Sequence, residues 1–163
     1  MIRVGVLTLS DSGAAGERKD KSGPVIEEVV QEIDGEVEYY QVIPDNKEMI
    51  IDELHKMAVN LELNLILTTG GTGLAPTDVT PDATKEVIER EVPGIPETMR
   101  AESLEKTRKA MLSRAVAGTK EESLIINLPG SPKAVKECLE VILEVIPHAV
   151  ELLQDEVEDC ARE

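Results

Sequence analysis

The 163-residue sequence predicts an α/β domain of three layers, with helices covering both faces of a mostly parallel central sheet. Two observations lead to this fold class. Nearly continuous apolar runs, typical of strands buried on both faces, alternate with longer segments whose apolar residues recur at helical spacing. Such alternation builds β-α-β units, whose strands pair in parallel. Because the chain contains no linker, repeat or low-complexity segment, one domain over residues 1–163 is expected.

The first strand and the first helix are predicted near the N-terminus. Residues 2–9 form the first apolar run, and polar residues 10–22 follow, of which 13–20 are expected to form a mobile loop. Ser22 is predicted to cap a helix that has Pro24 in its first turn. The buried face of this helix is predicted to contain Ile26, Val29, Val30 and Ile33.

The middle of the chain repeats this order of strand and helix. Gly35 is predicted to end the first helix, and residues 36–43 to form the second strand. Asn46 is expected to cap the next helix, and residues 63–69 to form a third strand that ends at a glycine-rich segment. The buried face of this second helix is predicted to contain Ile50, Ile51, Leu54, Met57, Ala58 and Leu61.

A third helix is predicted to begin at Thr80 as its cap, with Pro81 at its first position. Residues 97–105 are expected to be helical, residues 115–118 to form a short strand and residues 123–128 to form a clear one.

The predicted closing helix is the longest. Ser131 is expected to cap it and Pro147 to kink it. Its buried side is predicted to contain Val135, Leu139, Ile142, Ile146 and Leu153.

Composition excludes several classes of function. A net charge of −16, with no Phe or Trp, argues against binding to nucleic acid. No apolar run approaches membrane-spanning length, and Met1 leads directly into a strand, so no signal peptide and a cytoplasmic protein are expected. Cys138 is interpreted as a small core residue and Cys160 as an exposed residue near the chain end; neither suits a zinc site or a disulfide.

Four breaks are predicted at the carboxyl ends of the strands, where ligands of open parallel sheets bind. They are Ser10-Asp11, Pro44-Asp45, Gly70 to Gly73 and Pro129-Gly130-Ser131. Several of these segments carry carboxylates or bare backbone suited to metal or phosphate. We therefore expect the functional site at this edge of the sheet.

The segment Gly70-Gly71-Thr72-Gly73, called the glycine loop below, is the first candidate. It is neither a dinucleotide fingerprint nor a P-loop. Its backbone N–H groups can approach an anion closely, and Thr72 adds a hydroxyl donor. Taken alone, the same residues also fit a tight turn without function.

Asp78 strengthens the functional interpretation, because an acid just after a phosphate loop would repel the ligand unless a cation stood between them. Mg²⁺ binds one or two carboxylates together with phosphate oxygens. Asp45 by itself also fits a turn residue, and Asp82 fits an acid that compensates a helix dipole.

The chain has few cations near the predicted loops. Those near loops or helix ends are Lys21, Arg100, Arg114 and Lys133. His55 and His148 fall in predicted helices and are interpreted as structural, so no catalytic triad is expected.

Together these residues resemble the molybdopterin adenylyltransferase family, which contains the Mog- and MoaB-type proteins and the G domains of gephyrin. The similarity runs in order along nearly the whole chain. Its segments are Val6 to Asp11, Asp20 to Pro24, Pro44-Asp45, Leu67 to Ala83 (LTTGGTGLAPTDVTPDA), Glu89 to Gly94, Met111 to Arg114 and Ile125 to Gly130.

The resemblance implies a molybdopterin-binding domain of the predicted fold that assembles as a homotrimer or hexamer. It also implies a Mg²⁺-dependent reaction in which the terminal phosphate of molybdopterin attacks the α-phosphate of ATP. Adenylylated molybdopterin and pyrophosphate are then formed, and the former passes to a molybdenum insertase.

Site residues follow from the same resemblance. Asp45, Asp78 and Ser113 match the family's catalytic positions, with Asp78 and Asp45 as the acids that bind or organise Mg²⁺. Residues that match the substrate- and nucleotide-binding segments are Ser10, Asp11, Gly70, Gly71, Thr72, Gly73, Pro129 and Gly130.

Two alternatives to this enzyme stay open at the level of sequence. The first is a non-catalytic protein of the MoaB type that binds molybdopterin only. The second is a nucleotide-cleaving enzyme like the related domain of competence-damage proteins. Those proteins tend to have Gly-Gly-Leu-Gly where this chain has Gly-Gly-Thr-Gly, so the second alternative is less favoured.

Overall fold

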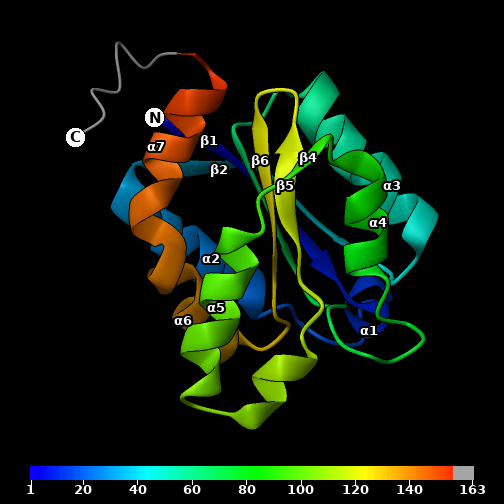
Figure 1. Cartoon of the computed structure of the whole chain (residues 1–163). Coiled ribbons are helices and arrows are strands. Elements are labelled where there is room, and N and C mark those ends of the chain that lie inside the picture. Colours follow the sequence, from blue (N-terminus) through cyan, green and yellow to red (C-terminus); the bar gives the residue numbers. More distant parts are fainter. Residues whose placement is uncertain (156–163) are drawn as a thin grey trace.

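Six strands form one sheet in the computed structural model, which describes residues 1–155 (Figure 1). The strands are β1 (Ile2–Leu9), β2 (Gly35–Ile43), β3 (Leu65–Thr69), β4 (Arg90–Glu91), β5 (Ala117–Lys120) and β6 (Ser123–Leu128). Their order is β2-β1-β3-β6-β5-β4. The first four are parallel neighbours, and β5 and β4 add to the edge in antiparallel orientation. The predicted mostly parallel sheet is confirmed.

Helices cover both faces of this sheet and complete the predicted three layers (Figure 1). They are α1 (Asp11–Ala14), α2 (Ser22–Val30), α3 (Lys47–His55), α4 (Thr80–Val87), α5 (Gly94–Leu104), α6 (Pro132–Ile142) and α7 (Ile146–Leu153). The helices α2, α5, α6 and α7 pack on one face, and α3 and α4 pack on the other.

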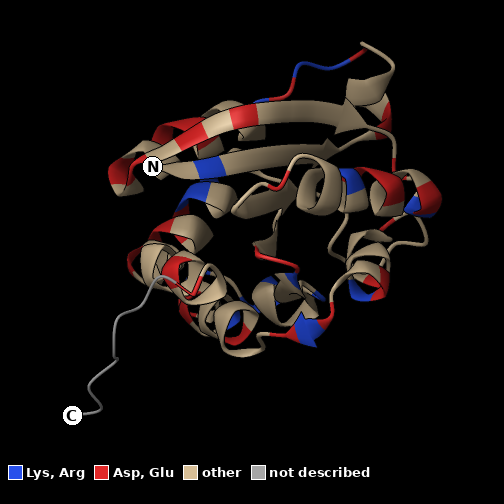
Figure 2. Cartoon of the chain, turned by 90° about the horizontal axis from the view of Figure 1, so that it is seen from above, with Lys and Arg blue, Asp and Glu red and all other residues tan. Residues whose placement is uncertain are grey.

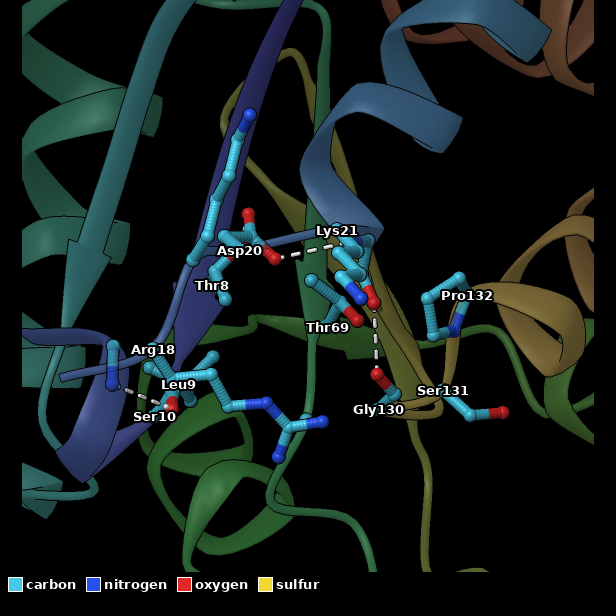
Figure 3. Close-up of a pocket in the computed structure, with 14 residues that line it drawn as sticks. Thr8, Leu9, Ser10, Arg18, Asp20, Lys21, Thr69, Gly130, Ser131 and Pro132 are labelled. Atoms are coloured by element: carbon cyan, nitrogen blue, oxygen red, sulfur yellow. Dashed lines mark hydrogen bonds between the residues drawn. The ribbon is translucent and has the colours of Figure 1, made fainter.

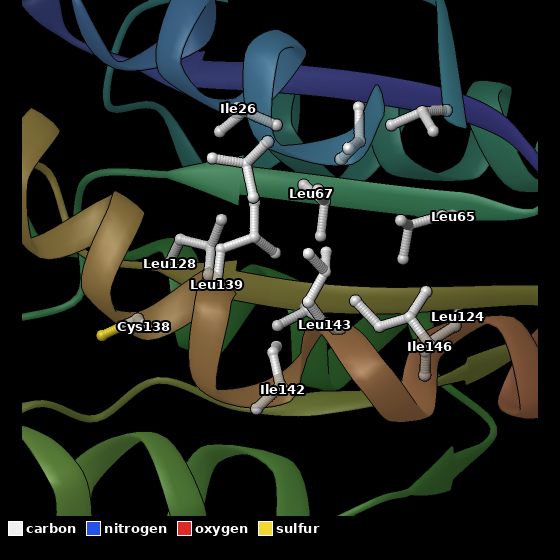
Figure 4. Close-up of a cluster of buried hydrophobic side chains, with 14 of the residues drawn as sticks. Ile26, Leu65, Leu67, Leu124, Leu128, Cys138, Leu139, Ile142, Leu143 and Ile146 are labelled. Carbon is white, nitrogen blue, oxygen red and sulfur yellow. The ribbon is translucent and has the colours of Figure 1, made fainter. Parts of the chain in front are cut away.

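Each central strand divides its apolar side chains between two cores. In β3, Leu65 and Leu67 enter the core beneath α2 and α6 (Figure 4), whereas Ile66 enters the core beneath α3 and α4. Fully burying a Leu or Ile side chain stabilises the fold by about 1.5–3 kcal/mol. Because alternate residues face opposite cores, a shift of one residue in the pairing of a strand would move each of its side chains to the other core. The strands are therefore held in a fixed register.

Two predicted helix caps are wrong, and both side chains make distant contacts instead. The Ser22 hydroxyl donates to the Gly130 carbonyl at 2.8 Å, and the Asp20 carboxylate accepts the N–H of Ser22 at 3.0 Å. Thr80 lies inside α4 and its hydroxyl donates to the Gly70 carbonyl at 2.9 Å. By contrast, the caps Asn46 and Ser131 are confirmed, since each accepts a backbone N–H of its helix.

Other helix and strand boundaries also differ from the predicted ones, in each case because of nearby residues. Part of the predicted mobile loop is the helix α1, which Ser10 caps by accepting the N–H of Gly13 at 3.0 Å. The two exposed residues of β4 gave no apolar pattern and were not predicted. The closing helix is interrupted at Leu143–Val145, because Pro147 has no N–H to donate to residue 143.

The remaining side-chain expectations concern cysteine, histidine and charge. Cys138 is buried, as predicted, and His55 and His148 are exposed, while the expectation for Cys160 lies outside the described residues. Acidic residues are spread over the outer helices (Figure 2). Among residues 1–155, no helix has both the length and the apolar character needed to cross a membrane.

Candidate functional site

The four predicted breaks meet at the carboxyl edge of the sheet. The N–H of Ser10 donates to the Ile43 carbonyl at 2.9 Å, which places the ends of β1 and β2 side by side. The N–H of Gly70 donates to the Leu128 carbonyl at 3.2 Å, and the Thr69 hydroxyl donates to the Pro129 carbonyl at 2.7 Å. The Ser22 hydroxyl also donates to the Gly130 carbonyl, so the structure brings together segments that are 108 residues apart in the sequence.

The glycine loop has a backbone that requires glycine. Gly70 and Gly71 have φ angles of 98° and 68°, in the left-handed region that side chains disfavour. A Cβ on Gly70 would lie 2.6 Å from the Leu9 carbonyl oxygen, and one on Gly71 would meet the side chain of Thr80. Gly70 and Gly71 therefore form a tight turn that residues with side chains would strain.

On one side of the loop is a cavity of about 410 Å³, which we call the basic cavity (Figure 3). Three of the predicted site residues line it, namely Ser10, Gly70 and Gly130. Its charged lining comes from one segment, residues 18–21, which we call the basic arm. Arg18, Lys19 and Lys21 give this cavity a cationic wall in a chain whose net charge is −16. Such a wall suits a phosphate-bearing ligand.

On the other side is a cavity of about 290 Å³, which we call the Ser113 cavity. It contains four further predicted site residues: Thr72, Gly73, Ser113 and Pro129. Its walls come from α5, α6 and the turn Arg108–Leu112. The charged residues here are Arg100, Lys106, Lys109 and Glu137, and the Lys106 amine lies 3.5 Å from the Glu137 carboxylate. The glycine loop therefore lies between two cavities, each of which is large enough for a phosphate group.

The predicted acids lie against the glycine loop. The carboxylate of Asp11 accepts the backbone N–H of Asp45 at 2.9 Å. A Cβ on Gly71 would lie 3.2 Å from a carboxylate oxygen of Asp45, and one on Gly73 would lie 2.8 Å from a carboxylate oxygen of Asp78. Of the described residues that line the two cavities, none is one of these three acids. The acids are therefore neighbours of the loop and not of the cavity walls.

Burial and the charges of neighbouring acids both act on Asp45. Burial raises the pKa of its carboxyl above the usual range, and the negative charges of Asp11 and Asp78 raise it further. A backbone hydrogen bond that links it to Asp11 opposes this rise. The site thus concentrates negative charge that a bound cation would neutralise.

The donor set fits a Mg²⁺ ion that is shared with a ligand. Among residues 1–155, no group of three or more His, Cys, Asp or Glu side chains is arranged to hold a metal alone. Mg²⁺ characteristically uses one or two carboxylates and completes its shell with water and phosphate oxygens. Asp45 and Asp78 supply that number of carboxylates beside the glycine loop.

Arg114 holds the loop in place, a role that sequence reasoning did not assign. Its backbone N–H donates to the Thr72 carbonyl at 2.8 Å, and its Nε donates to the Gly73 carbonyl at 2.8 Å. The rest of the guanidinium donates to both oxygens of Asp82 and to the Asp78 carbonyl. Hydrogen bonding to Arg114 lowers the pKa of Asp82. Asp82 is therefore a partner of Arg114 as well as a first-turn acid.

Sequence reasoning also missed the basic arm. The sequence predicts a mobile loop for Arg18 and Lys19, and of the arm's cations only Lys21 is among the predicted candidates. The signal that could have found them is the density of cations in residues 18–21 of a strongly acidic chain.

The comparisons with known proteins identify the family of this chain. The family model described as probable molybdopterin binding domain, MoCF_biosynth, matches residues 5–148. A molybdopterin adenylyltransferase of Helicobacter pylori is 43% identical over 93% of this chain and 88% of its own length. The molybdenum cofactor synthesis protein cinnamon of Drosophila melanogaster is 45% identical over 96% of this chain, which spans only 26% of that protein.

Among solved structures, the molybdopterin biosynthesis enzyme MoaB of Thermus thermophilus superposes with a TM-score of 0.90. It is 51% identical, and the match covers 95% of this chain and 98% of that one. The family model and these similarities extend over nearly the whole chain, including the glycine loop and all three acids. The chain belongs to the family of probable molybdopterin binding domains.

Proposed function

We propose that this protein is a molybdopterin adenylyltransferase, a nucleotidyltransferase that transfers AMP from ATP to the terminal phosphate of molybdopterin. The observation that supports this most is the position of the glycine loop between two cavities, one with a cationic wall and one that contains Ser113 and several cations. Such an arrangement suits two phosphate-bearing substrates whose phosphates meet at the loop. The Helicobacter pylori relative is itself named for this reaction.

In the proposed reaction a terminal phosphate oxygen of molybdopterin forms a bond to the α-phosphorus of ATP. The bond between the α-phosphorus and the oxygen that bridges to the β-phosphate breaks, and pyrophosphate leaves with that electron pair. The protein contributes positioning and charge stabilisation, and no protein nucleophile is needed.

Each group of residues has a part in this scheme. Backbone N–H groups of the glycine loop and the cations of both cavities bind and orient the phosphates, and Ser113 offers a hydroxyl in its cavity. Asp78 and Asp45 would hold Mg²⁺. When bound, Mg²⁺ supplies a positive charge that offsets the charge of the phosphate oxygens.

The proposed enzyme assembles as a homotrimer or hexamer and passes its product to a molybdenum insertase. Exposed apolar side chains near the Ser113 cavity support contact with another protein: Met111 is 63% and Leu112 50% exposed. Light scattering of the purified protein measures the assembly, and a monomeric mass would contradict it.

The test is synthesis of adenylylated molybdopterin from ATP and molybdopterin by purified protein with Mg²⁺. Asp78→Asn is expected to lower the rate at least about a hundredfold, since one preorganised charge contributes that much to a transition state. Asp52→Asn, the same change of charge at an exposed position on α3, is the control and should retain full activity. Removal of Mg²⁺ with EDTA should stop the reaction.

Two results would contradict the proposal. Binding of molybdopterin without any product would support the non-catalytic MoaB-type alternative. Full activity of Asp78→Asn would show that the metal site has been assigned to the wrong acids.

A further inference from the structure

The basic arm supplies all the charged residues that line the basic cavity: three cations and Asp20. A carboxylate in such a wall would weaken anion binding if it faced the ligand. Its hydrogen bonds show that it faces the protein instead.

Within residues 1–155, the hydrogen bonds of the Asp20 carboxylate all run to β1, β2 and the start of α2. One oxygen accepts the N–H of Ser22 at 3.0 Å. The other accepts the Thr8 hydroxyl at 2.8 Å, the Gly23 N–H at 3.1 Å and the Tyr40 hydroxyl. Asp20 thus ties the arm to β1, to β2 and to the start of α2. A charge with this many donors is strongly held, because hydrogen bonds to ionised groups are the stronger ones.

Tyr40 covers this carboxylate from the outside. It stands on the edge strand β2, and its side chain is 41% exposed. Burial and the hydrogen bond to Asp20 raise the pKa of Tyr40 to about 12, so its hydroxyl keeps the proton that it donates at any working pH. The space between the two is closed: a Cβ on Gly23 would lie 2.5 Å both from an Asp20 oxygen and from the Tyr40 ring.

The end of the arm is fixed to the opposite wall of the cavity. Ser22, which directly follows the arm, donates its hydroxyl to the Gly130 carbonyl at 2.8 Å. Figure 3 shows Arg18 and Lys21 in the same cavity, with the Arg18 side chain reaching into the space between Ser10 and Gly130. The position of these cations therefore depends on the anchor at Asp20.

We propose that Asp20 and Tyr40 are positioning residues, which hold the basic arm so that Arg18 and Lys21 face the phosphate groups of a bound substrate. This inference rests on the proposed function for the identity of the substrate. The anchoring of the arm itself can be measured without any catalytic assay.

The first test is limited trypsin digestion, because trypsin cleaves after Arg18, Lys19 and Lys21. Tyr40→Phe removes only the donated hydrogen bond and leaves the ring. Cleavage within the arm, followed by mass spectrometry, is expected to become roughly tenfold faster, since loss of a hydrogen bond to a charged group shifts local opening by that order. Tyr39→Phe is the matched control: its hydroxyl donates to Glu53 and accepts from Lys56, away from the arm.

The second test measures substrate use by the same variants. Tyr40→Phe is expected to raise the KM of ATP or of molybdopterin roughly tenfold, with kcat unchanged. In a background of Arg18→Gln the effect of Tyr40→Phe on that KM should be much smaller, because Tyr40 acts through the arm. A purely structural role would give equal effects in both backgrounds.

The outcomes separate this inference from the proposed function. If Tyr40→Phe matches Tyr39→Phe in cleavage rate, or leaves both KM values unchanged in an active enzyme, the inference is overturned. If the wild type makes no adenylylated molybdopterin, the proposed function is overturned and the inference about the arm is still untouched. The inference is then decided by calorimetry with inorganic pyrophosphate, whose affinity should fall roughly tenfold in Tyr40→Phe and not in Tyr39→Phe.

Discussion

Arg114 and Asp82 form a forked ion pair, with guanidinium nitrogens 3.2 and 3.1 Å from the two carboxylate oxygens. Asp82 lies in the first turn of α4, and the same guanidinium donates to the Gly73 carbonyl. The pair therefore connects the glycine loop to the helix that follows it.

Arg114→Lys is expected to destabilise the protein by about 1–3 kcal/mol, because an ammonium group cannot make these directed contacts simultaneously. The rate of adenylyl transfer should also fall, because the glycine loop loses the contacts that order it. Urea unfolding at pH 7 measures the stability, and Arg108→Lys, on the turn that lines the Ser113 cavity but outside this network, is the control. Unchanged stability in Arg114→Lys would contradict the role assigned to the fork.

The same pair predicts a dependence on pH. Pairing with Arg114 lowers the pKa of Asp82 in the folded state. A lowered folded-state pKa gives stability that is present above the unfolded-state pKa and is lost as the pH falls through the folded one. The difference in unfolding free energy between wild type and Arg114→Gln should therefore shrink as the pH is lowered below about 4, near the ordinary pKa of aspartate. A difference that stays constant down to acid pH would exclude this coupling.

A comparison of two glycines distinguishes the cost of a left-handed backbone from the cost of a steric clash. Gly71 and Gly16 have φ angles of 68° and 76°, but only Gly71 has atoms near the position of a Cβ. Gly16→Ala should cost about 1 kcal/mol from the left-handed conformation alone. Gly71→Ala should cost at least about 2 kcal/mol, because the methyl group also meets Thr80. Equal losses in urea unfolding would show that the contact with Thr80 does not matter.

Buried Asn127 connects β6 to the neighbouring strand and to α4. Its amide nitrogen donates to the Thr68 and Thr84 hydroxyls, both at 2.9 Å, and its oxygen accepts the Val116 N–H at 3.2 Å. Asn127→Leu is expected to destabilise the fold by about 1–3 kcal/mol, because it leaves that N–H without its side-chain partner. Thermal unfolding measures this loss, and the exposed Asn60→Leu should be close to neutral. A neutral Asn127→Leu would disprove the role of the amide.

Cys138 is expected to react slowly with alkylating agents in the folded protein. Burial raises the pKa of its thiol, which lowers the fraction of reactive thiolate at pH 8. In a Cys160→Ser background, where Cys138 is the only cysteine, iodoacetamide should react at least about tenfold faster in urea than in buffer. Mass spectrometry follows the reaction, and equal rates in the two solvents would be inconsistent with a protected thiol.

Local patterns in the sequence predicted five of the six strands, the helices that cover the sheet and the edge at which the candidate site lies. Apolar runs such as residues 2–9 require burial on both faces wherever they occur in a fold. Asn46 and Ser131 cap their helices because the N–H groups that they accept lie three residues away. The glycine loop was recognisable for a similar reason, since a run of glycines after a strand indicates a backbone that side chains disfavour.

Tertiary structure alone decided which distant groups those residues contact. Ser and Thr commonly cap helices, but the hydroxyls of Ser22 and Thr80 make other hydrogen bonds here. Ser22 donates to the Gly130 carbonyl, 108 positions away, and Thr80 donates to the Gly70 carbonyl. The anchor between Asp20 and Tyr40 likewise depends on how β2 lies beside β1. Periodicity and capping act over a few residues, and so they are visible in the sequence. Hydrogen-bond partners and cavity walls depend on which strand ends the sheet order places together, and only the folded chain determines them.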